Sequence, residues 1–402
     1  MMTSIAGHHP RRVVAGVSVG VVAALLLSWA APRAGGAVEA LDDIPVFEFD
    51  PTWPKLPLPN HWIMGNVAGM ASDEKGHIWV IQRPLSGNMS DDYAQLDPPA
   101  GECCRMPPSI IEFDTAGNVI QAFGGPDPKN PKGKRHPDGF EWPREHGLFV
   151  DRKGHVWTGS DEEGSSTITK LTHDGKLIKQ KGTFGKGHSN QDTENFGQPA
   201  GLFVDEKANE VYVADGYHNR RVIVMDADTL AFKRMWGAYG NVPKDIPKSE
   251  YRYNPDGPPS QQFSNPVHCV RISHDDLVYV CDRVNDRIQV FKKDGTFVKE
   301  QFVAPKTRGF GSVHDIAFST DPEQRFLYVA DGANRKVWML RRSDMAILGS
   351  FGHGGHYAGE FAITHAMAAD SKGNLYVGET IGGNRVQRFL FKGTRKGRRS
   401  SN

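Results

Sequence analysis

Short segments of alternating hydrophobic and polar residues recur along this chain, separated by tight polar turns. A period of two is typical of half-buried β-strands. In several places two such segments flank an Asp-x-x-Gly turn, as at residues 73–76, 151–154 and 370–373. The expected second strands span residues 78–81, 156–158, 211–214, 277–281, 327–330 and 375–378. The pattern therefore predicts a series of β-hairpins.

Each hairpin is followed by two further strand-like segments. The third often begins after an Asn-Arg pair, such as Asn334-Arg335, and the fourth ends near an aromatic-Gly pair, such as Trp236-Gly237. The whole unit repeats six times with a period of about 40–60 residues, which is typical of propellers and solenoids. Four short strands in each of six units predict an all-β fold, a six-bladed β-propeller.

The last repeat has no fourth strand of its own. An alternating segment at residues 44–50 stands alone before the first repeat. We expect it to pair with residues 384–391, because this would close the ring and remove an exposed edge. The predicted propeller domain is residues 41–391, and the basic residues 392–402 are expected to form a disordered tail.

The first 40 residues have the pattern of a targeting segment. Arg11 and Arg12 precede an apolar run at residues 13–31, and small residues follow at 34–37. This order is that of a signal peptide, although the run is almost long enough to span a bilayer. A cleaved signal and a membrane anchor through residues 13–31 both remain open. Either alternative predicts export to a periplasmic or extracellular location.

Composition agrees with this picture and excludes one class of partner. The chain has 44 Gly and 26 Pro, which suits short strands and turns. Its formal net charge is +1, and its basic and acidic residues are interspersed. We therefore expect no nucleic-acid partner. The expected state is a monomer that binds a small molecule or a peptide.

The four cysteines fall into two pairs. Cys269 and Cys281 flank a short turn that places them opposite each other, at a separation compatible with a disulfide. Cys103 and Cys104 are adjacent. A vicinal disulfide, a metal site and two reduced thiols are all open for this second pair.

One column of the aligned repeats is rich in histidine. It contains Ala68, His146, Ala200, His268, His314 and His365. His146, His268 and His365 come from alternate repeats, which lie about 120° apart in a six-fold ring, so their side chains can converge on the axis. Three imidazoles with an open fourth position form the ligand set of a catalytic zinc. His314 breaks the alternation, and a substrate contact or a purely structural role is open for it.

Three further side chains are expected at the mouth of the same ring. Arg83 and Arg283 occupy equivalent positions at the ends of second strands, and Tyr217 follows that position in the third repeat. A guanidinium can hold a carboxylate in a bidentate manner or stabilise a phenolate. Beside an arginine and a zinc, the tyrosine anion would be favoured, so Tyr217 is a candidate general base. A surface salt bridge for each arginine, and simple packing for Tyr217, are the alternatives.

The Asn-Arg-hydrophobic pattern resembles NHL repeats. From about residue 60 to 391 the chain resembles the peptidyl-α-hydroxyglycine α-amidating lyase family. The similar motifs are Glu145-His146-Gly147-Leu148, Asp215-Gly216-Tyr217-His218-Asn219-Arg220 and Asp282-Arg283-Val284-Asn285-Asp286-Arg287-Ile288. The resemblance implies a six-bladed propeller that cleaves peptidyl-α-hydroxyglycine to an amide and glyoxylate, with zinc on three histidines, a tyrosine base and arginines around the substrate.

The resemblance also sets out roles and one departure. It implies that Tyr217 takes the hydroxyl proton, that Arg83 supports its charge and that Arg283 orients the substrate carboxylate. Family members usually have Asp after the third zinc histidine, where it holds calcium, whereas this chain has Ala366. Calcium is therefore doubtful. A metal-dependent hydrolase or lactonase, and a non-enzymatic propeller that binds a protein, are the alternative functions.

Overall fold

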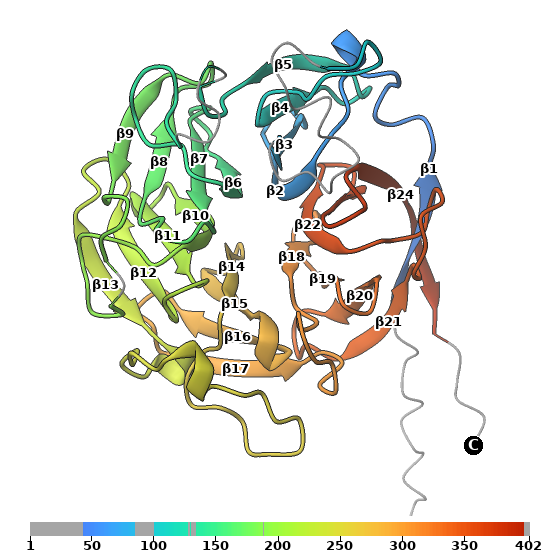
Figure 1. The fold of residues 1–402 in the computed structure, drawn as a ribbon. Coiled ribbons are helices and arrows are strands. Elements are labelled where there is room, and N and C mark those ends of the chain that lie inside the picture. Colours follow the sequence, from blue (N-terminus) through green and yellow to red (C-terminus); the bar gives the residue numbers. More distant parts are fainter. Residues whose placement is uncertain (1–42, 85–99, 128, 130–133, 188, 398–402) are drawn as a thin grey trace, which may run out of the picture. The chain divides into compact units, whose positions relative to one another are not determined.

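The computed structural model describes residues 43–84, 100–127, 129, 134–187 and 189–397. The predicted targeting segment, residues 1–40, lies outside this range. The described chain forms six four-stranded antiparallel sheets arranged as blades around one axis (Figure 1). The predicted six-bladed propeller is confirmed. No helix within the described ranges is long and apolar enough to cross a membrane.

In each of blades one to five, four consecutive strands run from the axis to the rim. Blade one contains β2 (Asn66–Ser72), β3 (Ile78–Arg83), β4 (Ile110–Phe113) and β5 (Val119–Phe123). Blade two contains β6 (Glu145–Val150), β7 (Val156–Ser160), β8 (Ile168–Leu171) and β9 (Leu177–Lys181). Blade three contains β10 (Pro199–Asp205), β11 (Glu210–Asp215), β12 (Arg221–Asp226) and β13 (Phe232–Trp236).

The second half of the ring repeats this order. Blade four contains β14 (Val267–Ile272), β15 (Leu277–Asp282), β16 (Arg287–Lys292) and β17 (Phe297–Phe302). Blade five contains β18 (Asp315–Phe318), β19 (Phe326–Asp331), β20 (Lys336–Arg341) and β21 (Ile347–Phe351). Blade six contains β22 (Thr364–Ala369), β23 (Leu375–Glu379), β24 (Val386–Lys396) and β1 (Asp43–Asp50). Short 3-10 turns are η1 (Pro59–His61), η4 (Ala238–Gly240), η5 (Lys248–Glu250) and η6 (Arg283–Asn285).

The hydrophobic core lies between neighbouring blades. Every residue of β11 is buried, because this strand packs against blades on both of its faces. One core cluster joins Val67 and Ile78 of blade one to Tyr376 of blade six. The rim strand β9 is half-buried or exposed along its length. Apolar residues on both faces of the inner strands therefore join the separate sheets into one ring.

Blades three, four and six end their second strand with a buried carboxylate that pairs with an arginine at the start of the third strand or directly before it. The pairs are Asp215–Arg221 (2.8 Å), Asp282–Arg287 (2.8 Å) and Glu379–Arg385 (2.7 Å). Each carboxylate also accepts a backbone N–H from the chain that enters the blade, donated by Gly197, Ser264 and Ala362 respectively. This carboxylate clamp fixes the strand end from which Tyr217 or Arg283 projects.

The N-terminal strand closes the ring. β1 is the rim strand of blade six and pairs antiparallel with β24 (Figure 1). The ring of Phe47 contacts the rings of Tyr328, Phe351 and Phe391, with centroids 5.2–5.8 Å apart. The predicted closure is therefore confirmed, and it joins the two ends of the propeller.

The prediction of a disordered tail is wrong for residues 392–396. These residues continue β24, where Lys396 lies opposite Asp43. Their backbone groups find partners on β1, and their charges meet carboxylates: Lys392 lies 2.9 Å from Glu48 and Lys396 lies 2.8 Å from Asp43. The propeller therefore extends to Lys396, and residues 398–402 lie outside the described range.

Removing the aromatic contact of the closing strand should destabilise the ring. We expect Phe47→Ala to lower the free energy of unfolding by about 2 kcal/mol, because a half-buried phenyl ring leaves a cavity among three other rings. The exposed neighbour Glu48→Ala should change it by less than about 0.5 kcal/mol. Denaturant titration of both variants measures the difference, and equal stabilities would contradict the role of β1 in closure.

Candidate functional site

Irregular strand pairing turns the histidine column toward the axis. In β2, β10, β14 and β22 the register shifts at the column position, which holds Ala68, Ala200, His268 and His365. In β6 the shift falls one residue later, at Gly147, whose φ is +68°. Such bulges bend a strand and re-aim a side chain. The sequence pattern predicts regular strands at these positions. Gly147 is the one residue in the pattern that could have indicated a bulge.

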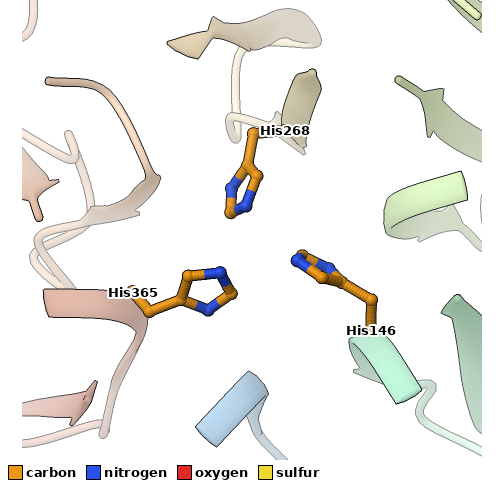
Figure 2. A group of neighbouring side chains, drawn as sticks. All are labelled: His146, His268 and His365. Atoms are coloured by element: carbon orange, nitrogen blue, oxygen red, sulfur yellow. The ribbon is translucent and has the colours of Figure 1, made fainter. Parts of the chain in front are cut away.

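His146, His268 and His365 converge on the axis, as predicted from their alternate blades. One ring nitrogen of each lies within 4.8 Å of the others, and the ring centroids are 4.8–5.0 Å apart (Figure 2). The three residues are 1–4% exposed. The three imidazoles thus share one small buried volume.

Backbone carbonyls of the next blade fix the orientation of two of these rings. Nδ1 of His146 lies 2.6 Å from the carbonyl oxygen of Ala200, and Nδ1 of His268 lies 2.5 Å from that of His314. Because a carbonyl only accepts, Nδ1 carries the proton, and Nε2 presents a lone pair to the centre. Nδ1 of His365 is buried and makes no hydrogen bond of normal geometry among the described residues. The backbone of Val67 is close enough to this ring to raise its pKa, against the larger lowering by burial.

The electrostatics keep the three rings neutral. Burial lowers the pKa of His146, His268 and His365 well below the ordinary imidazole value, and the positive charges of Arg83 or Arg283 lower it further. Neutral imidazole is the form that binds a metal, and a ring N–H donated to a carbonyl is the usual second contact of a ligating histidine. The donor set therefore fits a zinc ion bound through three nitrogens.

Tyr217 lies against this cluster. Its hydroxyl oxygen is 3.1 Å from Nε2 of His146, 3.1 Å from Nε2 of His268 and 3.1 Å from Nη1 of Arg283, which donates to it. Burial raises the pKa of Tyr217, while the charge of Arg283 opposes this rise. Without a further positive charge, the phenol therefore stays protonated at neutral pH.

Arg83 and Arg283 differ in their contacts. Arg83 donates to the carbonyl oxygen of Glu145 (2.8 Å) and to Asp161 (2.7 Å). Arg283 donates to Tyr217, and its Nε is buried with no hydrogen-bond partner among the described residues. The geometry thus favours Arg283, rather than Arg83, as the direct support of a phenolate.

Sequence reasoning missed Asp161 and Arg144. Asp161 accepts from Arg83 and also from Nε of Arg144 (2.8 Å), so one buried carboxylate holds two guanidinium groups beside the site. Asp161 follows the end of β7 just as Arg83 ends β3, and this equivalence of position was the signal available in the sequence.

His314 lies beside the cluster but outside the converging group. Its ring centroid is 5.7 Å from that of His268 and 6.0 Å from that of His365. Its Nδ1 accepts the backbone N–H of Gly332 at 3.2 Å, and its carbonyl orients His268. These contacts give His314 a structural role in holding a neighbouring ring.

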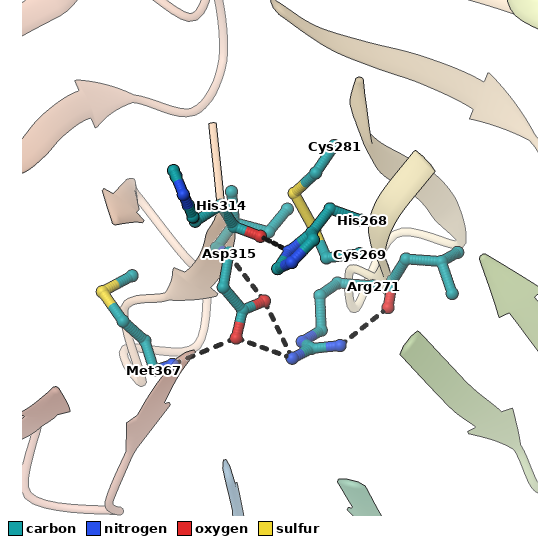
Figure 3. Close-up of a disulfide and its surroundings, with 9 residues drawn as sticks. His268, Cys269, Arg271, Cys281, His314, Asp315 and Met367 are labelled. Atoms are coloured by element: carbon teal, nitrogen blue, oxygen red, sulfur yellow. Dashed lines mark hydrogen bonds and ion pairs between the residues drawn. A yellow bond between two sulfur atoms is a disulfide. The ribbon is translucent and has the colours of Figure 1, made fainter. Parts of the chain in front are cut away.

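The calcium site that the resemblance implies lacks its carboxylate here, because Ala366 follows His365. A small cavity of about 20 Å³ is lined by the three histidines and also by Arg271 and Asp315. Asp315 lies 2.9 Å from the guanidinium of Arg271 and accepts the backbone N–H of Met367 at 3.0 Å (Figure 3). A fixed cation therefore already compensates the carboxylate that faces the channel below the site.

Both cysteine pairs are disulfides in the structure. Cys269 of β14 lies opposite Cys281 of β15, as the hairpin register predicts, and the bond joins the strand that carries His268 to the strand that precedes Arg283 (Figure 3). Cys103 and Cys104 form a vicinal disulfide, one of the three alternatives for this pair.

The fold and site define a six-bladed propeller with a buried three-histidine centre. No family model matches the chain. It is 27% identical to peptidyl-glycine alpha-amidating monooxygenase B of Xenopus laevis over 85% of this chain and 35% of that protein, so it spans about a third of that relative's length. It is 28% identical to NHL repeat-containing protein 3 of Mus musculus, over 86% of this chain and 84% of that protein.

A third relative is named as a lyase rather than as a monooxygenase. The chain is 28% identical to the probable peptidyl-alpha-hydroxyglycine alpha-amidating lyase of Caenorhabditis elegans, over 63% of each. A solved structure of streptogramin B lyase matches 88% of this chain and all of that one with a TM-score of 0.51 at 13% identity, which shows the fold alone. The homologues of this propeller thus include NHL repeat-containing protein 3 and amidating lyase.

We expect the fold to be independent of calcium. Chelating calcium should leave the melting temperature of the native protein unchanged, because Arg271 supplies the charge that Asp315 needs. Arg271→Ala should cost about 3 kcal/mol of stability by leaving a buried carboxylate unpaired. Arg271→Lys, which keeps the charge, is the matched control. Thermal melts with and without chelator test this, and a marked loss of stability in the chelated native protein would refute it.

Proposed function

We propose that this protein is a zinc-dependent lyase that cleaves the carbinolamide C–N bond of a peptidyl-α-hydroxyglycine, or of a related N-acyl-α-hydroxyglycine. One observation carries the proposal. Three neutral imidazoles each present one ring nitrogen to one point, and the Tyr217 hydroxyl lies 3.1 Å from Nε2 of two of them and 3.1 Å from Arg283. The similarity to amidating enzymes supports the choice of reaction.

The residues of the site have different roles in the proposed reaction. His146, His268 and His365 hold the metal, which when bound supplies Lewis-acid polarisation of a substrate oxygen. Tyr217 takes the proton of the substrate hydroxyl, and Arg283 favours its anionic form. The C–N bond then breaks as the C=O of glyoxylate forms, and the amide nitrogen gains a proton. Atoms balance without water, so the reaction is an elimination.

Arg283 can serve the substrate as well as the base. Its Nη1 is directed to Tyr217, whereas its buried Nε lacks a partner within the described ranges. A substrate carboxylate beside Tyr217 would satisfy this donor. Arg83 contributes a second positive charge, although its own hydrogen bonds fix Glu145 and Asp161.

We also propose that the protein acts after export. The charged and apolar pattern of residues 1–40 and the two disulfides support this location. Fractionation of cells that express the full chain tests it: recovery only from a reducing cytoplasmic fraction, with free thiols at Cys269 and Cys281, would contradict export.

The metal should depend on the three-histidine centre. We expect one zinc per purified chain by elemental analysis, and none in His146→Ala, while circular dichroism shows a folded propeller in both. His155→Ala in the same blade is the matched control, because His155 bonds to Asp151 at the opposite face. Native protein that binds no zinc, or equal zinc in His146→Ala, would refute the assignment.

Turnover should depend on the Tyr217 hydroxyl. Tyr217→Phe keeps the ring but removes the proton acceptor, so we expect kcat for glyoxylate release to fall by roughly 10²–10⁴. Arg283→Ala should lower kcat and raise KM together, because Arg283 contacts the base and borders the substrate position. Zinc-loaded protein that releases no glyoxylate but hydrolyses a lactone would favour the hydrolase, and protein inactive on both would favour a binding propeller.

A further inference from the structure

Arg220 is a buried cation with almost no partners. It is 1% exposed, and its Nε donates to Oδ1 of Asn265 at 2.7 Å. Its Nη1 and Nη2 are both buried, and neither has a hydrogen-bond partner in the part of the chain that the structure describes. Buried charged groups are normally paired, so this guanidinium requires an explanation.

The adjacent residue, Arg221, is a buried arginine whose guanidinium nitrogens all have hydrogen-bond partners. Arg221 is also fully buried, and its Nε donates to Asp215 at 2.8 Å. Its Nη1 and Nη2 donate to the backbone carbonyls of Asn190, Asp192 and Asn195. Burial alone therefore does not explain why Nη1 and Nη2 of Arg220 lack hydrogen bonds, because the equally buried Arg221 forms a full set of them.

No carboxylate among the described residues forms a hydrogen bond with the guanidinium of Arg220. The ring of Tyr251 lies over its guanidinium, with the carbon Cζ 5.3 Å from the ring centroid. Asp282 is close enough to act on Arg220, but its oxygens are bonded to Arg287, Asn285 and the backbone of Ser264. The carboxylate of Asp282 is thus fully used by its own blade.

A second cation lies nearby. Burial lowers the pKa of Lys248 on η5, the charge of Glu163 raises it, and the charge of Arg220 lowers it by a smaller amount. Both groups belong to the face of blades three and four on which the loops lie, and Arg220 is three residues from Tyr217. The buried guanidinium of Arg220, whose two terminal nitrogens have no partner among the described residues, is a donor that an anion would satisfy.

We propose that Arg220, beneath Tyr251, forms an oxyanion-binding site that takes a carboxylate or a phosphate group. The two terminal nitrogens of a guanidinium form a planar fork that matches two oxygens of such a group. The anion would pair the buried charge. This site is separate from the three histidines and does not depend on the proposed lyase activity.

The test is the thermal response of the full-length protein to acetate and to inorganic phosphate, each against chloride at equal ionic strength and pH. We expect a saturable rise in melting temperature with at least one of the oxyanions and none with chloride. A response to acetate alone identifies a carboxylate site, and a response to phosphate identifies a phosphate site. No response to either oxyanion would overturn the proposal.

Variants assign the response to Arg220. Arg220→Met keeps an apolar stem under Tyr251, so in chloride it should melt at or above the native temperature, and its response to oxyanion should be lost. Arg221→Met, the equally buried neighbour, should instead be strongly destabilised, because it breaks a satisfied ion pair. Arg220→Lys, which retains the charge without the fork, should fold and respond more weakly.

One more variant distinguishes this anion site from the proposed metal site. His146→Ala removes a proposed metal ligand and should keep the full response to oxyanion, whether or not the protein is a lyase. An unchanged response in Arg220→Met, or a response lost in His146→Ala, would place the anion elsewhere and refute the proposal. A crystal structure with the responding anion bound to Nη1 and Nη2 would show the contact directly.

Discussion

The buried carboxylate at the end of the second strand is the contact on which the site face depends. Asp215 and Asp282 are 0% exposed, and each joins an arginine of the third strand to a backbone N–H of the entering chain. One carboxylate thus fixes three segments of a blade at one point. Because Tyr217 and Arg283 follow these carboxylates by one or two residues, the clamp determines where their side chains lie. Blade one uses Gln82 instead, which accepts from Gly65 and donates to Pro107.

The small residues of the histidine column matter as much as the histidines. Ala200 occupies the column between His146 and His268, and its carbonyl oxygen accepts from His146. A larger side chain at this position would enter the space that the three imidazoles share. The carbonyl of His314 orients His268 in the same way. The alternating blades therefore supply the three histidines, and the intervening blades supply the backbone acceptors that set the tautomer of two of them.

Repeat periodicity made the fold and the histidine cluster predictable. A period of two gave the strands, the six-fold repeat gave the ring, and equivalent positions in alternate blades must meet at the axis, as His146, His268 and His365 do. The continuation of β24 to Lys396 was not predictable from its own composition, because it depends on pairing with Asp43 and its neighbours at the other end of the chain. From composition alone, a basic segment is predicted to be a solvated tail, and only the partner strand shows that it is part of a sheet.

The roles of the arginines were not predictable for a similar reason. Arg83 and Arg283 are equivalent by repeat position, but the residue opposite each is set by contacts between blades: Asp161 lies 78 positions from Arg83, and Tyr217 lies 66 positions from Arg283. Asp161 pairs with both Arg83 and Arg144, whereas Arg283 faces Tyr217, whose pKa is raised by burial. The three imidazoles are neutral as well. Arg283 thus brings a positive charge to the centre, and its Nε has no partner among the described residues; the proposed function requires such a group to hold a substrate carboxylate beside the tyrosine.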